Sequence, residues 1–124
     1  HMNTLQNLVN DFPEFFQDTW DISIEHGWIP IIRKVCENIK EEIKRNPSAS
    51  NFSFAQIKEK FGRLRIYCNN LTDEIQSIVE KGMAESYHTC EYCGSTQNVS
   101  NDADGGSWIK TLCSSCHEKR KSAG

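Results

Sequence analysis

Apolar residues recur at helical spacing in three segments of the chain. The first segment, residues 3–20, predicts a helix that Pro13 divides into two pieces. The second segment, residues 29–45, has the most regular apolar stripe, and Pro30 is compatible with its first turn. The third segment follows Thr72, a residue type that caps helix N-termini. Its buried stripe is expected to comprise Ile75, Ile78, Val79, Met83 and Tyr87.

Alternation of apolar and polar residues replaces the helical period between Phe52 and Cys68. The central segment Lys60–Arg63 contains a glycine and can turn the chain, so the pattern predicts an antiparallel β-hairpin. The face toward the core is expected to carry Ala55, Ile57, Leu64, Ile66 and Cys68. The opposite face is expected to carry Phe54, Gln56, Lys58, Arg63, Arg65 and Tyr67.

Four of the six cysteines form two C-x-x-C pairs, Cys90 with Cys93 and Cys113 with Cys116, with residues 94–112 between them. This spacing is typical of a zinc site in which four thiolates complete a tetrahedron and leave no position for water. The sequence therefore predicts one structural Zn²⁺ ion bound by these four side chains. Unrelated or redox-active cysteine pairs are the alternative, which the matched spacing disfavours.

The residues around the two pairs predict a knuckle, a hairpin and then a helix, which is the order of a treble-clef finger. Residues 98–106 are predicted to be a polar turn, residues 107–112 a short strand and residues 117–121 a helix. His88 and His117 lie beside the cysteines in the sequence and could each replace one ligand. Because four thiolates are available, both histidines are expected to be surface neighbours of the metal site and not ligands.

The remaining cysteines and the three tryptophans are expected to be structural. Cys36 and Cys68 fall on apolar faces, so we expect buried free thiols. Trp20, Trp28 and Trp108 are expected to lie mostly in the core, and any exposed one would mark a contact surface.

The finger resembles the metal-binding frame of HNH-type nucleases, which pairs a C-x-x-C-G knuckle with a final L-C-x-x-C-H-x-x-K stretch. That frame is matched by residues 92–94, residues 112–117 and Lys119. Those nucleases need a histidine base in the intervening hairpin, and residues 94–112 contain no histidine. We therefore expect no nuclease activity, and no catalytic constellation stands out elsewhere in the chain.

Four further motifs extend over most of the chain from residue 27 to residue 116: Gly27–Pro30, Gln56–Arg65, Ala84–Ser86 and Trp108–Cys113. Together they resemble an uncharacterised family of small bacterial and phage proteins with a QIKEKFGxLR motif. The resemblance implies a single structural unit and a bacterial or phage context. It implies no activity.

Length and charge limit the remaining possibilities. A chain of 124 residues is the size of one ordinary domain. The predicted class is α+β, with N-terminal helices, a central β-hairpin, a third helix and a treble-clef-like zinc finger. Residues 3–87 are expected to form the helical part with the hairpin, and residues 88–121 the finger packed on it. With no long apolar span and no leader, we expect a cytoplasmic protein of a bacterium or a phage-infected host, without membrane contact.

The hairpin face opposite the core is the candidate binding surface. Lys58, Arg63 and Arg65 lie there among Gln56 and Tyr67, and basic residues with aromatic neighbours can bind phosphate and stack on a base. Two alternatives stay open. The face could be solvated without a ligand, or Arg65 could pair internally with an acid such as Glu85.

The expected function is that of a non-enzymatic, zinc-stabilised interaction protein, a phage or bacterial regulator or inhibitor that binds a larger host protein. The net charge of −3 disfavours a general nucleic-acid-binding domain. The alternative is a nucleic-acid or nucleotide-binding module that uses the basic hairpin face and the finger.

Overall fold

The computed structural model describes residues 4–123, so Asn3, where the first helical segment was expected to begin, lies outside the described residues. Five α-helices, two short 3₁₀ helices and five strands follow one another along this part of the chain. In order they are α1 (Leu5–Asp11), α2 (Pro13–Phe16), β1 (Asp21–Ser23), η1 (His26–Trp28), α3 (Ile29–Arg45), η2 (Pro47–Ala49), β2 (Ser53–Lys60), β3 (Arg63–Asn69), α4 (Asp73–Ser86), β4 (Val99–Asp102), β5 (Lys110–Cys113) and α5 (Ser114–Ala123).

The helices agree with the periodicity of the sequence. Pro13 occupies the first turn of α2, and Phe12 separates that turn from α1, so the first segment is two helices, as predicted. Helix α3 has the predicted bounds. At the start of α4 the Thr72 hydroxyl accepts a hydrogen bond of 3.2 Å from the Ile75 N–H, as expected of an N-cap. Tyr87 was wrongly assigned to the buried stripe, because it follows the last helical residue and is 47% exposed.

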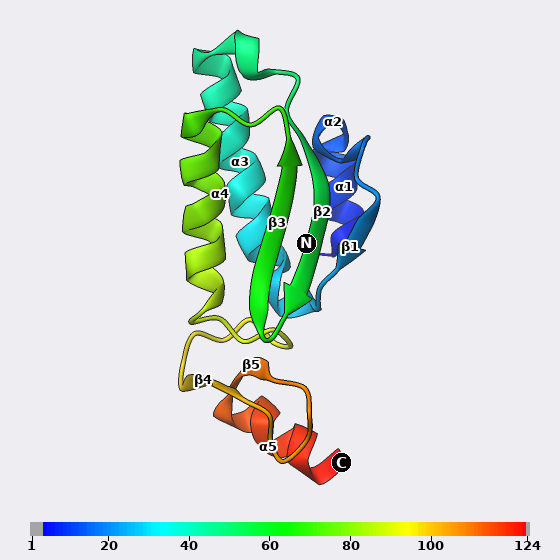
Figure 1. Ribbon diagram of the computed structural model, residues 1–124, viewed down its shortest axis with the longest axis vertical. Helices are drawn as coiled ribbons and strands as arrows, with labels where there is room; N and C mark the ends of the chain where they lie inside the picture. Colours follow the sequence, from blue (N-terminus) through cyan, green and yellow to red (C-terminus); the bar gives the residue numbers. More distant parts are fainter. Residues whose placement is uncertain (1–3, 124) are drawn as a thin grey trace.

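The hairpin belongs to a three-stranded sheet of order β1-β2-β3. Strands β2 and β3 pair antiparallel as predicted, and the short strand β1, which was not predicted, pairs parallel with β2. The Trp20 N–H also donates a 3.0 Å hydrogen bond to the Ala55 carbonyl. Helices α1 to α4 lie on one side of this sheet, and the other face is open (Figure 1).

A β-bulge changes the predicted sides of the hairpin at one position. The register shifts between Phe54 and Gln56, so Ala55 is the extra residue. Phe54 therefore lies on the core face and is fully buried, in contrast to its predicted place on the open face. Its ring packs against Phe15, Phe16 and Phe52. This aromatic group joins α2 to the sheet.

The finger lies beyond the turn of the hairpin (Figure 1). A knuckle, the β4–β5 hairpin and then α5 follow one another in the order expected of a treble clef. The prediction of a polar turn was wrong for β4, which pairs with β5. Two of the three tryptophans were also wrongly placed: Trp28 is fully buried, but Trp20 is 71% and Trp108 75% exposed. The predicted α+β class is confirmed.

No helix among the described residues is both long and apolar enough to cross a membrane. The two cysteines outside the finger differ in burial. Cys36 is fully buried in the core, and burial raises the pKa of its thiol. Cys68 is half-buried, and burial raises its pKa to about 12. Both thiols are therefore protonated at neutral pH.

A glycine marks the closest approach of the two parts of the molecule. A Cβ atom on Gly27 would lie 2.1 Å from the Cys90 carbonyl oxygen and 2.5 Å from that of Glu91. Because both neighbours are backbone atoms, we expect Gly27→Ala to lower the free energy of unfolding by more than about 2 kcal/mol, measured by urea denaturation. Gly106→Ala is the matched control, since its nearest neighbour is 3.4 Å away. Equal stability of the two variants would contradict this packing.

Candidate metal centre

The four predicted ligand cysteines come together at one point. Cys90 and Cys93 lie in the knuckle after α4, Cys113 ends β5, and Cys116 lies in the first turn of α5. Their sulfur atoms all lie within 4.8 Å of one another. Within residues 4–123 this is the group of side chains suited to hold a metal ion. The cluster is the predicted one, residue for residue.

The geometry of the cluster fits a bound metal better than disulfides. The sulfurs of Cys93 and Cys113 are 3.7 Å apart, and all six cysteines of the chain are free. A disulfide needs a sulfur separation of about 2.05 Å, whereas a tetrahedral site with bonds of about 2.3 Å places its sulfurs about 3.8 Å apart. The four thiol groups would therefore hold one tetrahedral ion with little rearrangement.

The knuckle favours the thiolate of Cys90. Burial alone would raise its pKa, but backbone N–H groups of Cys93, Cys113 and Tyr92 point at the sulfur, and the net pKa falls to about 7. Gly94 adopts a φ of +82°, the conformation that the tight turn requires. The knuckle thus supplies a metal ligand that is easily deprotonated.

Neither neighbouring histidine takes part in the cluster, as predicted. His88 is exposed. His117 was expected at the surface but is buried, with Nδ1 2.6 Å from an Asp104 carboxylate oxygen and Nε2 2.9 Å from the Ser100 carbonyl. Burial opposes protonation of this ring, but the two oxygens outweigh it and raise the pKa. His117 therefore ties the β4–β5 loop to α5.

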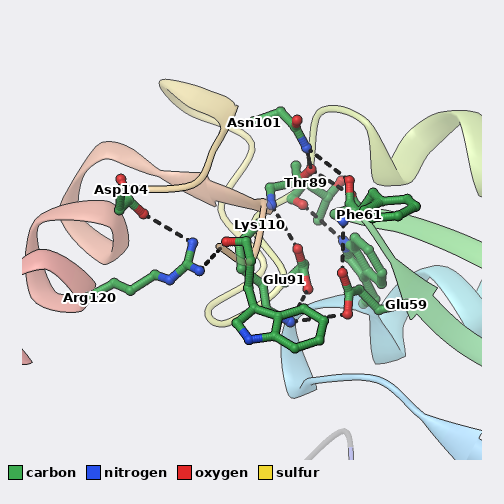
Figure 2. A network of polar contacts seen from close by, with 12 residues as sticks. Glu59, Phe61, Thr89, Glu91, Asn101, Asp104, Lys110 and Arg120 are labelled. Carbon is green, nitrogen blue, oxygen red and sulfur yellow. Dashed lines mark hydrogen bonds and ion pairs between the residues drawn. The ribbon is translucent and has the colours of Figure 1, made fainter. Parts of the chain in front are cut away.

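A buried carboxylate joins the finger to the sheet (Figure 2). Glu91, next to the first ligand cysteine, is fully buried and accepts a 2.7 Å hydrogen bond from the Thr111 N–H. Lys110 lies 3.2 Å from Glu91 and 3.2 Å from Glu59 of β2, so one ammonium group bridges the two parts. Burial raises the pKa of Glu91, and the bonds from Thr111 and Lys110 oppose that rise.

The hairpin turn inserts into this junction. The Thr111 hydroxyl donates a 2.6 Å hydrogen bond to the Gly62 carbonyl, and the Gly62 N–H donates one of 2.7 Å to Glu59. On the other side, the Trp28 indole N–H donates to the Thr89 carbonyl at 2.9 Å. The finger is thus held by hydrogen bonds both to the turn of the sheet and to the start of α3.

The five predicted partner-binding residues lie on the open face of the sheet, in the predicted alternation. Gln56 pairs with Tyr67, and Lys58 pairs with Arg65, across the two strands; Arg63 begins β3. We term Gln56, Lys58, Arg63, Arg65 and Tyr67 the basic sheet face. Gln56 is engaged there, because its amide donates a 3.0 Å hydrogen bond to Asp21 of β1.

A groove adjoins this face along the free edge of β3. It encloses about 470 Å³ between β3 and α4 and is lined by Arg63, Leu64, Arg65, Glu80, Met83, Ala84 and Tyr87. The Arg63 guanidinium stacks 4.4 Å from the centre of the Tyr87 ring. This role of Tyr87 was not predicted, and only its place just after a helix end could have suggested that its side chain is exposed.

The proposed internal pairing of Arg65 with Glu85 is absent from the described part of the chain. The Arg65 Nε atom is buried and has no hydrogen-bond partner there. An unpaired buried donor is costly unless a ligand supplies the acceptor. The groove therefore holds a guanidinium group that no acid among residues 4–123 neutralises.

Comparison with known proteins adds no constraint: the chain matches no protein-family model, no curated protein and no solved structure. The resemblance to a bacterial and phage family therefore stays a prediction.

The junction can be tested through Lys110. We expect Lys110→Met to lower the free energy of unfolding by about 3 kcal/mol, because it removes the cationic partner of a buried carboxylate. Adding Glu91→Gln to that variant should restore part of the loss, since the amide oxygen still accepts from Thr111. Urea denaturation followed by tryptophan fluorescence measures both.

The control for this pair is Lys44→Met, which removes an exposed ion pair with Glu41. Exposed pairs contribute at most about 1 kcal/mol. If Lys110→Met costs no more than this control, the bridge does not hold the finger in place.

Proposed function

We propose that this protein is a non-enzymatic, zinc-stabilised interaction module that docks on a larger protein through its basic sheet face. The observation that carries the proposal is the distribution of its five arginines. Arg33, Arg45 and Arg120 each form an ion pair with an acid of the chain. Arg63 and Arg65 form none within the described residues, and both lie on the basic sheet face beside the groove.

Unpaired arginines on a shaped surface suit recognition of a partner. A guanidinium group offers a planar fork of donors to a carboxylate, and arginine is over-represented among residues that dominate interface affinity. The chain itself carries 17 acidic against 14 basic residues, so acids were available for pairing. In a bacterial or phage-infected cell, such a module would act as a regulator or inhibitor of the protein that it binds.

The metal in this proposal is zinc in a structural role. Four thiolates form a closed shell without a position for water or substrate, and zinc accepts that donor set and geometry. The ion would connect the knuckle, β5 and α5. This part of the chain has only a small apolar cluster of its own, made of Cys90, Cys113, Cys116 and Leu112 with Val99 packed against it.

Elemental analysis of the purified protein should find about one zinc per chain. Cys113→Ser should lose the metal and expose residues 88–121 to protease, because metal binding and folding of the finger are coupled. Cys68→Ser is the control, since that thiol lies outside the cluster and should not affect zinc content. A folded finger that contains no metal would refute the structural role.

A second candidate function is binding of nucleic acid or nucleotides. Tyr67, 50% exposed on the same face as the arginines, favours it, because bases stack on aromatic rings. Salt dependence separates the two candidates. Binding that depends on phosphate contacts weakens steeply with added salt, whereas a desolvated protein interface responds less.

The partner-binding proposal predicts a specific loss. Capture of a protein from nuclease-treated bacterial lysate should fail with Arg63→Ala/Arg65→Ala and persist with Lys34→Ala/Lys44→Ala. The control removes the same charge from exposed positions of α3. Equal capture by the two double variants would exclude the basic sheet face. If untreated lysate yields material that nuclease removes and treated lysate yields no protein, the second candidate is favoured.

A further inference from the structure

Strand β3 is an edge of the sheet with free backbone groups. Among residues 4–123, the strand order places β2 on one side of β3 and no strand on the other. A two-residue turn joins Lys60 to Arg63, so the backbones of these two residues hydrogen-bond to each other. In an antiparallel ladder such hydrogen-bonded pairs alternate with non-hydrogen-bonded pairs, and Leu64 and Ile66 belong to the non-hydrogen-bonded pairs. The backbone groups of Leu64 and Ile66 therefore point away from β2. Among the described residues they form no hydrogen bond outside the sheet.

The groove next to this edge has the form of a slot for one more strand. Strand β3 forms one wall, and the other is formed by Glu80, Met83 and Ala84 of α4 together with Tyr87, which follows the helix. In an added strand, successive side chains would point alternately to the open face and into the groove. On the open face they would meet Arg63 and Arg65. In the groove they would meet Met83 and Ala84, with Glu80 on the same wall.

Charge complementarity identifies the occupant. An antiparallel pairing of β3 with β3 of a second copy would bring arginines next to arginines, and like charges opposite each other destabilise a ladder. A strand with carboxylates on one face would instead meet Arg63 and Arg65 of β3. Arg65 forms no ion pair within the described residues, and a carboxylate on the added strand would supply one.

A nucleic acid fits the groove less well than an acidic peptide. Glu80 lines the groove and would repel a phosphate backbone, and its carboxylate is engaged at one oxygen by Gln76. A peptide can place an apolar or polar side chain there. The net charge of −3 also opposes any long polyanion more than a short acidic segment.

We propose that the groove between β3 and α4 binds an extended acidic segment of the partner protein, which adds to the sheet as a strand beside β3. This inference rests on the proposed function and names the chemistry of its partner. Backbone hydrogen bonds to Leu64 and Ile66 supply affinity in such strand addition, and the side-chain contacts supply specificity. Arg63, held by Tyr87, and Arg65 bind the carboxylates.

The test uses the zinc-loaded full chain and a fluorescein-labelled octapeptide of alternating glutamate and valine. Fluorescence anisotropy should detect binding, and a lysine–valine peptide should not bind. Two further peptides carry backbone N-methyl groups, one on all valines and the other on all glutamates. Because alternate N–H groups of a strand point to opposite sides, one methylated peptide should bind about tenfold more weakly and the other within about twofold of the parent.

Protein variants add a second measurement. Arg65→Gln should weaken the acidic peptide about tenfold, whereas Lys34→Gln on the exposed side of α3 should leave it unchanged. Circular dichroism and zinc content establish that both variants fold.

The remaining outcomes overturn strand addition in distinguishable ways. If both methylated peptides bind like the parent, the arginines bind carboxylates without strand addition, and the proposed function stands. If the acidic peptide fails to bind at about 1 mM, strand addition is wrong, and lysate capture judges the proposed function separately. If a short oligothymidylate displaces the peptide with a steep salt dependence, the site binds nucleic acid and both proposals fail.

Discussion

The buried carboxylate of Glu91 is the interaction on which the relation between the two parts of the molecule depends. The finger cannot attach itself by apolar burial, because its own cluster is small. It attaches by hydrogen bonds that are shielded from water, centred on a fully buried acid next to a metal-ligand cysteine. Burial of a charge is tolerated only with complete pairing, and the Thr111 N–H and Lys110 provide it. The knuckle, β5 and β2 are thereby held in one arrangement.

This arrangement extends the influence of the metal site to the sheet. Thr111 is separated from Cys113 by one residue and donates to the carbonyl of Gly62 in the hairpin turn. Arg63 follows that turn, and its guanidinium stacks on Tyr87 at the end of α4. A small cavity at the same place is lined by Arg63, Tyr87, Asn101 and Thr111. The end of the groove is therefore shaped by residues of the finger as well as the sheet.

Local patterns predicted those parts of the structure that local interactions determine. The helical period located α3, an N-cap located the start of α4, and two C-x-x-C pairs identified the cluster. Features that depend on tertiary contact were missed. Strand β1 has only three residues and shows no alternation of apolar and polar residues. The bulge at Ala55 moves Phe54 to the core face, and no glycine in the sequence indicates a bulge there. Glu91 resembles an ordinary polar knuckle residue until Lys110 and Glu59 are seen beside it.

The arginines of this chain differ in whether their hydrogen-bond donors are already used within the protein. Arg120 is fixed by Asp104 and by the carbonyls of Asp102 and Trp108, so it belongs to the architecture of the finger. Arg63 is fixed by an aromatic ring, which orients a guanidinium without consuming its hydrogen-bond donors. Orientation without neutralisation leaves those donors available to an external acceptor. Since the turn that precedes Arg63 is held by the finger, a structural metal would contribute to the proposed partner binding by holding this side chain in position, without contact with the partner.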